Sequence, residues 1–178
     1  MFKPWPKIPR GNPLLVTITE KIDGTNGCII VENGKLVGVQ SRKRLISPKN
    51  DNYNFAKWCY ENEEEVLKLG EGYHYGEWAG EGIQKNPHRL VGKHFFLFNT
   101  FRWGEHNKPP SIFKTVPVLY QGSLEGDTID SLLKGLKEEE NKGTYKPEGI
   151  IVYYHTTRSY TKHTLRDVKG KWVNEKEV

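Results

Sequence analysis

The sequence contains little cysteine, little methionine and no long hydrophobic run. Cys28 and Cys59 are its only cysteines and do not form a CxxC pair, and the six histidines show no spacing typical of a zinc site. We therefore expect both thiols to be reduced and structural, as is usual in the cytoplasm. No apolar stretch approaches the length of a membrane span, and the N-terminal residues lack the apolar centre of a signal peptide. These absences predict a cytoplasmic protein with no membrane partner.

Size and charge restrict the architecture and the class of partner. A chain of 178 residues with 35% apolar and 28% charged residues fits one polar globular domain that has room for a core. Its formal net charge is +5, and residues 1–60 carry ten basic and four acidic side chains ahead of a glutamate-rich stretch at residues 61–71. A basic region of this kind favours polyanions such as nucleic acid or nucleoside triphosphates, although an ordinary solvated surface explains the charge equally well.

Hydrophobic periodicity and turn signals predict strands with a smaller share of helix. Four prolines within residues 1–13 favour an extended N-terminal segment. Asn33 and Gly34 are typical of a two-residue hairpin turn. Strands are expected at residues 14–20, 28–31, 36–40, 73–78, 94–101, 116–121, 147–154 and 160–165, and helices at residues 53–69 and 127–139.

The segment between the first two expected strands concentrates polar chemistry around one lysine. Lys21 follows an apolar run, and Asp23, Thr25 and Asn26 surround Gly24, a residue that permits positive φ and close backbone approach. We interpret Lys21 as a nucleophile. An amine attacks phosphorus only when it is neutral, and lowering a lysine pKa from ~10.4 by ~3 units costs about 4 kcal/mol, which partial burial and neighbouring positive charge can supply. Taken alone, Lys-x-Asp-Gly is more often a polar strand end with a turn glycine.

Further candidates lie at the ends of other expected strands. Arg42 and Arg44 belong to a basic turn, which by itself is more typical of an exposed loop. Glu77 ends a strand beside a glycine-rich loop, and alone it is more often a surface acid than a ligand-binding one. Phe98 lies in a strongly aromatic strand, most of whose rings are expected in the core. None of these residues identifies a site without the others.

Glu148 and Lys162 complete an ordered series, because they lie on the last two expected strands, which we interpret as an antiparallel pair. In chain order the series is Lys21-Ile22-Asp23-Gly24, Arg42 and Arg44, Glu77, Phe98, Glu148-Gly149 and Lys162. This series resembles the covalent nucleotidyltransferase superfamily of ATP-dependent RNA and DNA ligases and GTP-dependent capping enzymes. The RNA ligase branch is nearest, because Glu20-Lys21-Ile22-Asp23-Gly24-Thr25-Asn26 is similar to its Lys-x-(His/Asp)-Gly-Thr-Asn motif.

The resemblance covers residues 5 to about 165 and implies both a fold and a reaction. The implied fold is an α+β nucleotidyltransferase (ligase adenylation) domain, in which antiparallel sheets flanked by helices enclose an ATP cleft. Lys21 would attack the α-phosphorus of ATP to form lysyl-AMP. Glu148 would bind Mg²⁺ or Mn²⁺, since a carboxylate suits a hard cation, and Lys162 would neutralise charge on the α-phosphate.

The same resemblance implies how the nucleotide is held. Asn26 would order the phosphate or a metal-bound water, and Arg42 or Arg44 would contact phosphates or the ribose side. Glu77 would accept hydrogen bonds from the ribose hydroxyls, and Phe98 would stack on adenine. The remaining residues expected to contact the nucleotide are Glu20, Ile22, Asp23, Gly24 and Lys162.

Two departures from the family pattern bear on this expectation. The last family motif is Lys-x-Lys, whereas His163 and Thr164 follow Lys162 in this sequence. Lys169-Gly170-Lys171 matches the motif further along the chain and is the less favoured alignment. The motifs leave no room for an OB-fold within the 178 residues. We expect a single adenylyltransferase domain over residues 1–178, with an extended segment at 1–13 and a charged tail at 166–178.

These observations predict an ATP-dependent polynucleotide ligase that joins 5′-phosphate and 3′-hydroxyl ends through lysyl-AMP, with RNA favoured over DNA. ATP-dependent DNA ligation and GTP-dependent capping are the alternatives within the enzyme class. A non-catalytic module that binds nucleic-acid ends is the alternative of another class: Lys21, Glu77 and Glu148 argue against it, and the incomplete last motif argues for it. The sequence leaves open the oligomeric state and whether the substrate is a nick, a single-strand break or a cleaved tRNA.

Overall fold

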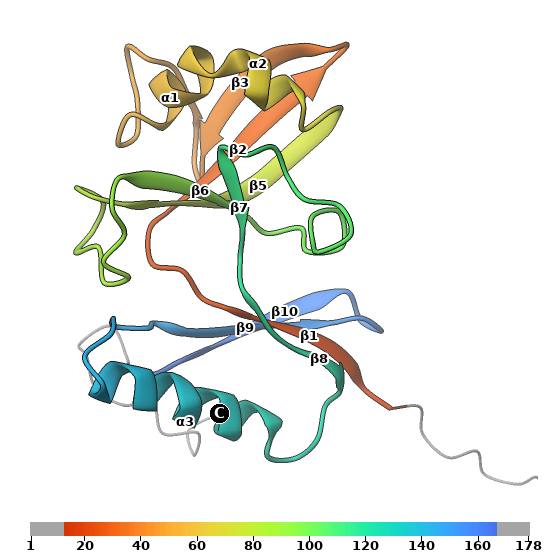
Figure 1. Ribbon diagram of the computed structural model, residues 1–178. Coiled ribbons are helices and arrows are strands. Elements are labelled where there is room, and N and C mark those ends of the chain that lie inside the picture. Colours follow the sequence, from red (N-terminus) through yellow and green to blue (C-terminus); the bar gives the residue numbers. More distant parts are fainter. Residues whose placement is uncertain (1–12, 167–178) are drawn as a thin grey trace, which may run out of the picture.

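The computed structural model describes residues 13–166, which fold into two β-sheets that face each other (Figure 1). The six-stranded sheet has the order β4-β3-β2-β5-β6-β7, and the four-stranded sheet has the order β10-β9-β1-β8. Helices α1 and α2 cover the outer face of the six-stranded sheet, and α3 covers the outer face of the other (Figure 1). The elements are β1 Leu15–Glu20, β2 Thr25–Glu32, β3 Lys35–Ser41, β4 Leu45–Ile46, α1 Phe55–Glu61, α2 Glu63–Leu67, β5 Gly72–Gly80, β6 Lys93–Leu97, β7 Phe113–Thr115, β8 Val118–Ser123, α3 Thr128–Asn141, β9 Gly149–Tyr154 and β10 Ser159–Thr164.

The α+β class predicted from the sequence is confirmed. Strand pairings in the four-stranded sheet are antiparallel, and those in the six-stranded sheet are antiparallel except between β6 and β7, which run parallel. The predicted hairpin turn between β2 and β3 is also present, because Asn33 and Gly34 have φ values of 53° and 66°.

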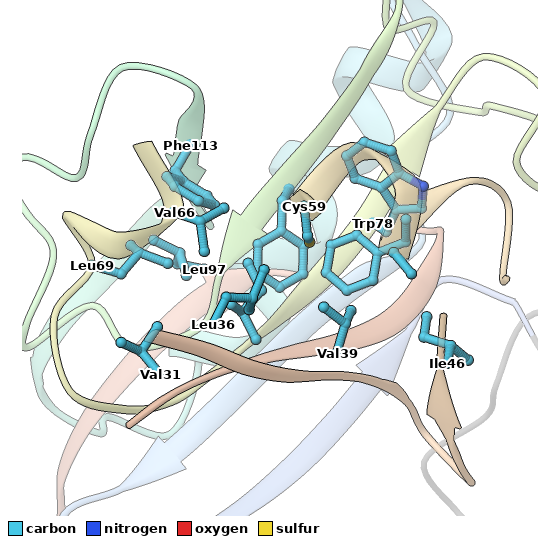
Figure 2. Packing of buried hydrophobic residues seen from close by; sticks show 14 of the residues in the cluster. Val31, Leu36, Val39, Ile46, Cys59, Val66, Leu69, Trp78, Leu97 and Phe113 are labelled. Carbon is cyan, nitrogen blue, oxygen red and sulfur yellow. The ribbon is translucent and has the colours of Figure 1, made fainter. Parts of the chain in front are cut away.

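Aromatic rings fill the core between the six-stranded sheet and its helices. The ring centroid of Phe55 on α1 lies 4.7 Å from that of Phe95 on β6 and 5.3 Å from that of Trp78 on β5. Figure 2 shows how Trp78, Cys59 and Val39 converge in this layer with the other buried side chains. Cys28 and Cys59 are both buried and free, as predicted. Because alternate residues of a strand face opposite sides, the second face of this sheet remains for the cleft between the sheets.

The helix predicted over residues 53–69 is present in two pieces, with Asn62 as the break between α1 and α2. Asp51 caps the first piece. Its carboxylate accepts hydrogen bonds from the backbone N–H groups of Ala56 and Lys57, both at 2.8 Å. A carboxylate at this position satisfies N–H groups of the first turn that have no partner within the helix.

The four-stranded sheet packs its outer face against α3. Ile18, Ile150 and Val152 are fully buried there, together with Leu136 of the helix. The helical spacing of Ile129, Leu132, Leu133 and Leu136 predicted this face correctly.

The strand predicted over residues 94–101 was wrong at its C-terminal end. Strand β6 ends at Leu97, and the chain then turns, with the Thr100 N–H donating to the Phe98 carbonyl. Phe101 is consequently 63% exposed instead of belonging to the core, and Phe98, which was expected to stack on adenine, is 43% exposed. The short parallel strand β7 was not predicted, because three residues give too little periodicity.

Within residues 13–166 the chain passes between the sheets twice, through residues 21–24 from β1 to β2 and through residues 116–117 from β7 to β8 (Figure 1). No helix in this range is both long enough and apolar enough to cross a membrane. The extended segment predicted at residues 1–13 and the tail predicted at residues 166–178 lie outside the described residues except for residues 13 and 166. The alternative Lys169-Gly170-Lys171 motif lies wholly outside them.

Candidate active site

A cleft of about 810 Å³ lies between the two sheets and contains the lysine singled out in the sequence. This volume is within the range of ~300–1,000 Å³ that is typical of small-ligand pockets. The predicted site residues that line it are Glu20, Lys21, Ile22, Asn26, Arg42, Glu77 and Phe98. We call the part of the cleft around Lys21, Glu148 and Glu77 the reactive end.

Two bonds bring Lys21 and Glu148 together across the sequence. The backbone N–H of Lys21 donates to the carbonyl of Gly149 at 2.9 Å, which aligns the end of β1 with the start of β9. The Lys21 ammonium then donates to Glu148 Oε2 at 2.5 Å, and the two side chains are 24% and 33% exposed. Gly149 itself has a φ of 149°, and a Cβ there would lie 2.1 Å from the His163 carbonyl oxygen. The glycine of the predicted Glu148-Gly149 pair is therefore required by the close passage of β10.

Of the two properties expected of Gly24, a positive φ and a close backbone approach, the structure shows only the second. Its φ is not among the positive values of the chain, so conformational freedom does not explain this glycine. A Cβ would instead lie 2.4 Å from the Trp78 carbonyl oxygen and 2.9 Å from the Ala79 Cβ. Gly24 lets the crossing segment lie directly against β5, and this contact fixes the path of the chain between Lys21 and β2.

Asn26 and Glu77 face each other on neighbouring strands. They are register partners between β2 and β5, and Asn26 Nδ2 donates to Glu77 Oε2 at 2.7 Å. Glu77 is 8% exposed. Burial raises the pKa of its carboxyl from 4.5 to about 7, against the lowering effects of the Lys21 charge and the Asn26 hydrogen bond. The repulsion from Glu148 and Asp23 adds to the increase.

Glu20 is held in a buried polar cluster beside Lys21. His88 Nε2 lies 3.2 Å from Glu20 Oε1, and the two side chains are 8% and 9% exposed. Tyr145 belongs to the same cluster. The pKa of its phenol is raised chiefly by burial and further by the charge of Glu20 and a hydrogen bond to it. The Lys146 N–H donates to the Pro87 carbonyl at 2.9 Å. The loop after β5 is thus attached both to the residue before Lys21 and to the segment that leads into Glu148.

The two candidate arginines are in different places. Arg42 lines the cleft just beyond β3. Arg44 does not reach it, because its guanidinium donates to the backbone carbonyls of Asn50 at 2.8 Å and Asp51 at 3.1 Å. Arg44 therefore stabilises the loop after β4, and only Arg42 is in place to contact a ligand in the cleft.

The other predicted residues lie at the edges of the reactive end. Ile22 is buried among Ala79, Phe96 and Val116 and forms part of the cleft wall. Asp23 is half-buried and is not one of the lining residues. Lys162 is exposed on β10 directly opposite Ile151, a lining residue, so it shares the cleft side of the four-stranded sheet.

Cys28 also lines the cleft, but it is not a competing nucleophile. Burial raises the pKa of its thiol to about 11, so the thiolate is scarce at neutral pH. The amine of Lys21, in contrast, lies in the cleft next to the carboxylate of Glu148.

Sequence reasoning missed five aromatic rings that line the cleft: Tyr73, Tyr75, Phe101, Tyr153 and Tyr160. The spacing Tyr73, Tyr75, Glu77 was a usable signal, since residues two apart on a strand share a face. The contribution of His88 had no such signal, because it comes from an irregular loop.

The donor groups suit a hard cation only in part. The described residues contain no group of three or more His, Cys, Asp or Glu side chains arranged to hold a metal ion. Mg²⁺ commonly binds through one or two carboxylates, with phosphate oxygens and water completing its shell. Glu148, which is one-third exposed beside the amine, fits this limited role.

Comparison with known proteins identifies the fold and the family. Structures of Naegleria gruberi RNA ligase are similar: a variant with ATP and Mn (20% identity, TM-score 0.59, covering 84% of this chain and 48% of that one) and a complex with PPi (19% identity, TM-score 0.60, covering 85% and 50%). The chain therefore spans about half the length of these ligases. No curated protein matches the sequence. A family model for RNA ligases matches residues 15–173, which is most of the 178-residue chain, and the chain belongs to the RNA ligase family.

Proposed function

We propose that this chain is the adenylating module of an ATP-dependent RNA ligase and that Lys21 carries the AMP. The observation that supports this most directly is the Lys21 amine held 2.5 Å from Glu148 Oε2 inside a cleft of nucleotide size. Membership of the RNA ligase family supports the same conclusion, and the similar Naegleria gruberi enzyme has been solved with ATP and Mn.

In the first step Lys21 Nζ attacks the α-phosphorus of ATP. A P–N bond forms, the bond from the α-phosphorus to the bridging oxygen breaks, and pyrophosphate leaves with that electron pair. The amine must lose a proton to attack, and Glu148 Oε2 is the acceptor next to it. The close pair thus orients the nucleophile before ATP arrives, which lowers the entropic part of the barrier.

The walls of the cleft fit the rest of the nucleotide. Glu77, held by Asn26, offers carboxylate oxygens to the ribose hydroxyls. Phe98 is 43% exposed at the cleft and presents its ring to adenine. Arg42 supplies a guanidinium for the phosphates. Lys162 approaches from β10 as a second cation for the α-phosphate.

A divalent cation, Mg²⁺ or Mn²⁺, would be held by Glu148 together with phosphate oxygens and water. When bound, it supplies positive charge that stabilises the transferring phosphate. The AMP then passes from Lys21 to a 5′-phosphate on the strand. A 3′-hydroxyl displaces AMP in the last step and forms the phosphodiester.

The test is covalent labelling. Purified protein is incubated with Mg²⁺ and ATP labelled at the α-phosphate, and denaturing electrophoresis with peptide mapping locates the label. We expect Lys21 to carry AMP in the wild-type protein and in Lys35→Ala, an exposed hairpin lysine that serves as the matched control, and to carry none in Lys21→Ala. Protein shown to be free of pre-bound AMP that takes up no label from ATP or GTP would contradict an enzymatic role and favour a non-catalytic module that binds nucleic-acid ends.

The same preparation tests the substrate. Unlabelled GTP that competes as well as ATP would contradict ATP specificity and favour the capping alternative. Sealing of 5′-phosphate RNA ends in preference to DNA ends supports an RNA ligase, and the reverse preference supports a DNA ligase. Lys21→Ala should abolish sealing while leaving strand binding nearly unchanged.

A further inference from the structure

The cleft extends well beyond its reactive end, and this extension is lined by aromatic rings. Tyr73 and Tyr75 lie on β5 on the same face as Glu77, so at ~3.4 Å per residue they lie about 14 and 7 Å from it along the strand. Tyr153 lies five residues from Glu148 and directly opposite Tyr160 on β10. Phe101 contributes the fifth ring. We call these five rings the aromatic end.

Ring contacts join the two sheets at the aromatic end. The Phe101 centroid lies 5.9 Å from that of Tyr153 and 5.3 Å from that of His155, both edge-to-face. The loop that carries Phe101 begins beside Tyr75, because the Phe98 N–H donates to the Tyr75 carbonyl at 3.0 Å. The rings of β5 and those of β9 and β10 therefore lie at the same end of one continuous cleft.

The rings are ordered by one another yet open to solvent. Tyr73 and Tyr75 stack at 6.2 Å and 20°, and Tyr153 and Tyr160 lie 4.8 Å apart. Nevertheless Tyr73 is 55% exposed and Tyr160 is 69% exposed. Aromatic rings that are held in place but exposed on one face are suited to stacking a planar ligand.

The charges favour a strand of nucleic acid over a protein segment. The acidic residues that line the cleft, Glu20 and Glu77, are both at the reactive end. Lys162 lies two residues from Tyr160 on the same face of β10. Hydroxyl and amide side chains line the cleft next to the rings, because Thr17 is paired with Tyr153 and Asn99 and Thr100 precede Phe101. Rings interleaved with polar groups and a cation match bases and phosphates better than the aliphatic surface of a partner protein does.

We propose that the aromatic end is a stacking subsite for an unpaired base of the strand whose 5′-phosphate receives AMP at the reactive end. A base that enters the cleft cannot remain in a duplex, so the subsite assigns single-stranded ends as the substrate in preference to nicks in a continuous duplex. This inference rests on the proposed ligase function and names its substrate class.

The test measures binding and adenylation separately. Fluorescence anisotropy is recorded without ATP on a labelled, 5′-phosphorylated 12-nucleotide RNA and on the blunt duplex of the same sequence. We expect tighter binding of the single strand, and about 5- to 100-fold weaker single-strand binding by Tyr160→Ala, the effect of losing one stacking ring. Tyr160→Trp, which keeps a ring, should restore binding. Tyr60→Ala removes an exposed ring outside the cleft and is the matched control.

A second variant and the adenylation assay control for misfolding. Tyr73→Ala should reproduce the loss, which guards against misfolding of one variant, and lysine labelling by ATP should continue in all of them. Unchanged RNA binding by both alanine variants would overturn the subsite and leave the rings as a surface for a protein segment. Equal losses for single strand and duplex, or loss of labelling together with binding, would also overturn it. A wild-type protein that stacks RNA in this way but takes up no AMP would refute the ligase function and leave the subsite standing.

Discussion

The buried carboxyl of Glu77 should make stability depend on pH. Its pKa rises from 4.5 to about 7 chiefly because burial disfavours the charged form. Below pH 4.5 the group is protonated in both the folded and the unfolded chain, so it costs nothing. Between pH 4.5 and about 7 the unfolded chain loses the proton while the folded chain keeps it. The folded state then binds more protons, and the free energy of unfolding falls as the pH rises.

The size of this effect follows from the two pKa values. The difference between 4.5 and about 7 corresponds to about 3 kcal/mol, fully lost above the folded pKa. Glu77→Gln removes the ionisation and keeps an oxygen that can accept the hydrogen bond from Asn26. We expect the variant to gain up to about 3 kcal/mol over the wild-type protein between pH 4.5 and 8.

Urea unfolding followed by tryptophan fluorescence across this pH range measures the difference, since Trp78 is buried on the same strand. Taking the difference between two proteins cancels the titration of the groups that they share. Glu81→Gln, on the exposed loop that follows, is the matched control and should change stability little at any pH. A difference between Glu77→Gln and the wild-type protein that stays constant with pH would refute the burial argument.

Two further predictions concern residues whose placement the structure decides. Arg42→Ala should slow the labelling of Lys21 about tenfold or more, because a charged hydrogen bond to the nucleotide is lost. Arg44→Ala should instead lower the free energy of unfolding by about 1 kcal/mol and leave the labelling rate unchanged. The opposite pattern would show that the roles of the two arginines have been exchanged. Gly24→Ala forces a Cβ to within 2.4 Å of the Trp78 carbonyl oxygen and should cost more than ~2 kcal/mol and abolish labelling. The control is Gly135→Ala, at an open position of α3, which should stabilise the protein by about 0.5–1 kcal/mol. Thermal unfolding of both variants measures these changes, and destabilisation by Gly135→Ala as well would show that the loss in Gly24→Ala is not specific to its site.

The sequence predicted the elements of the fold well wherever local physics decides them. The Asn33-Gly34 turn, the strands on either side of it and the apolar face of α3 depend on residues close in sequence, and they were predicted correctly. The break at Asn62 and the end of β6 at Leu97 were not predicted. Both depend on how the chain packs against the other elements, which periodicity within one segment does not report.

The residues of the candidate site show the same division. The order Lys21, Glu77, Phe98, Glu148, Lys162 could be recognised in the sequence because it resembles the motif order of a known family, although most of these residues taken alone indicate no function. Which of them meet is a tertiary matter. Lys21 and Glu148 are 127 positions apart and come together only because β1 pairs with β9.

Tertiary packing alone separated Arg42 from Arg44 and placed Phe101, expected in the core, in the cleft wall beside Phe98. The sequence does not distinguish which of two arginines in one turn contacts a ligand. An aromatic run likewise does not indicate where its strand ends. The sequence by itself thus determined the family and the chemical groups, because these are written in residue types and their order. The structure decided which groups share a cleft, because burial, register and pKa arise only when distant segments pack together.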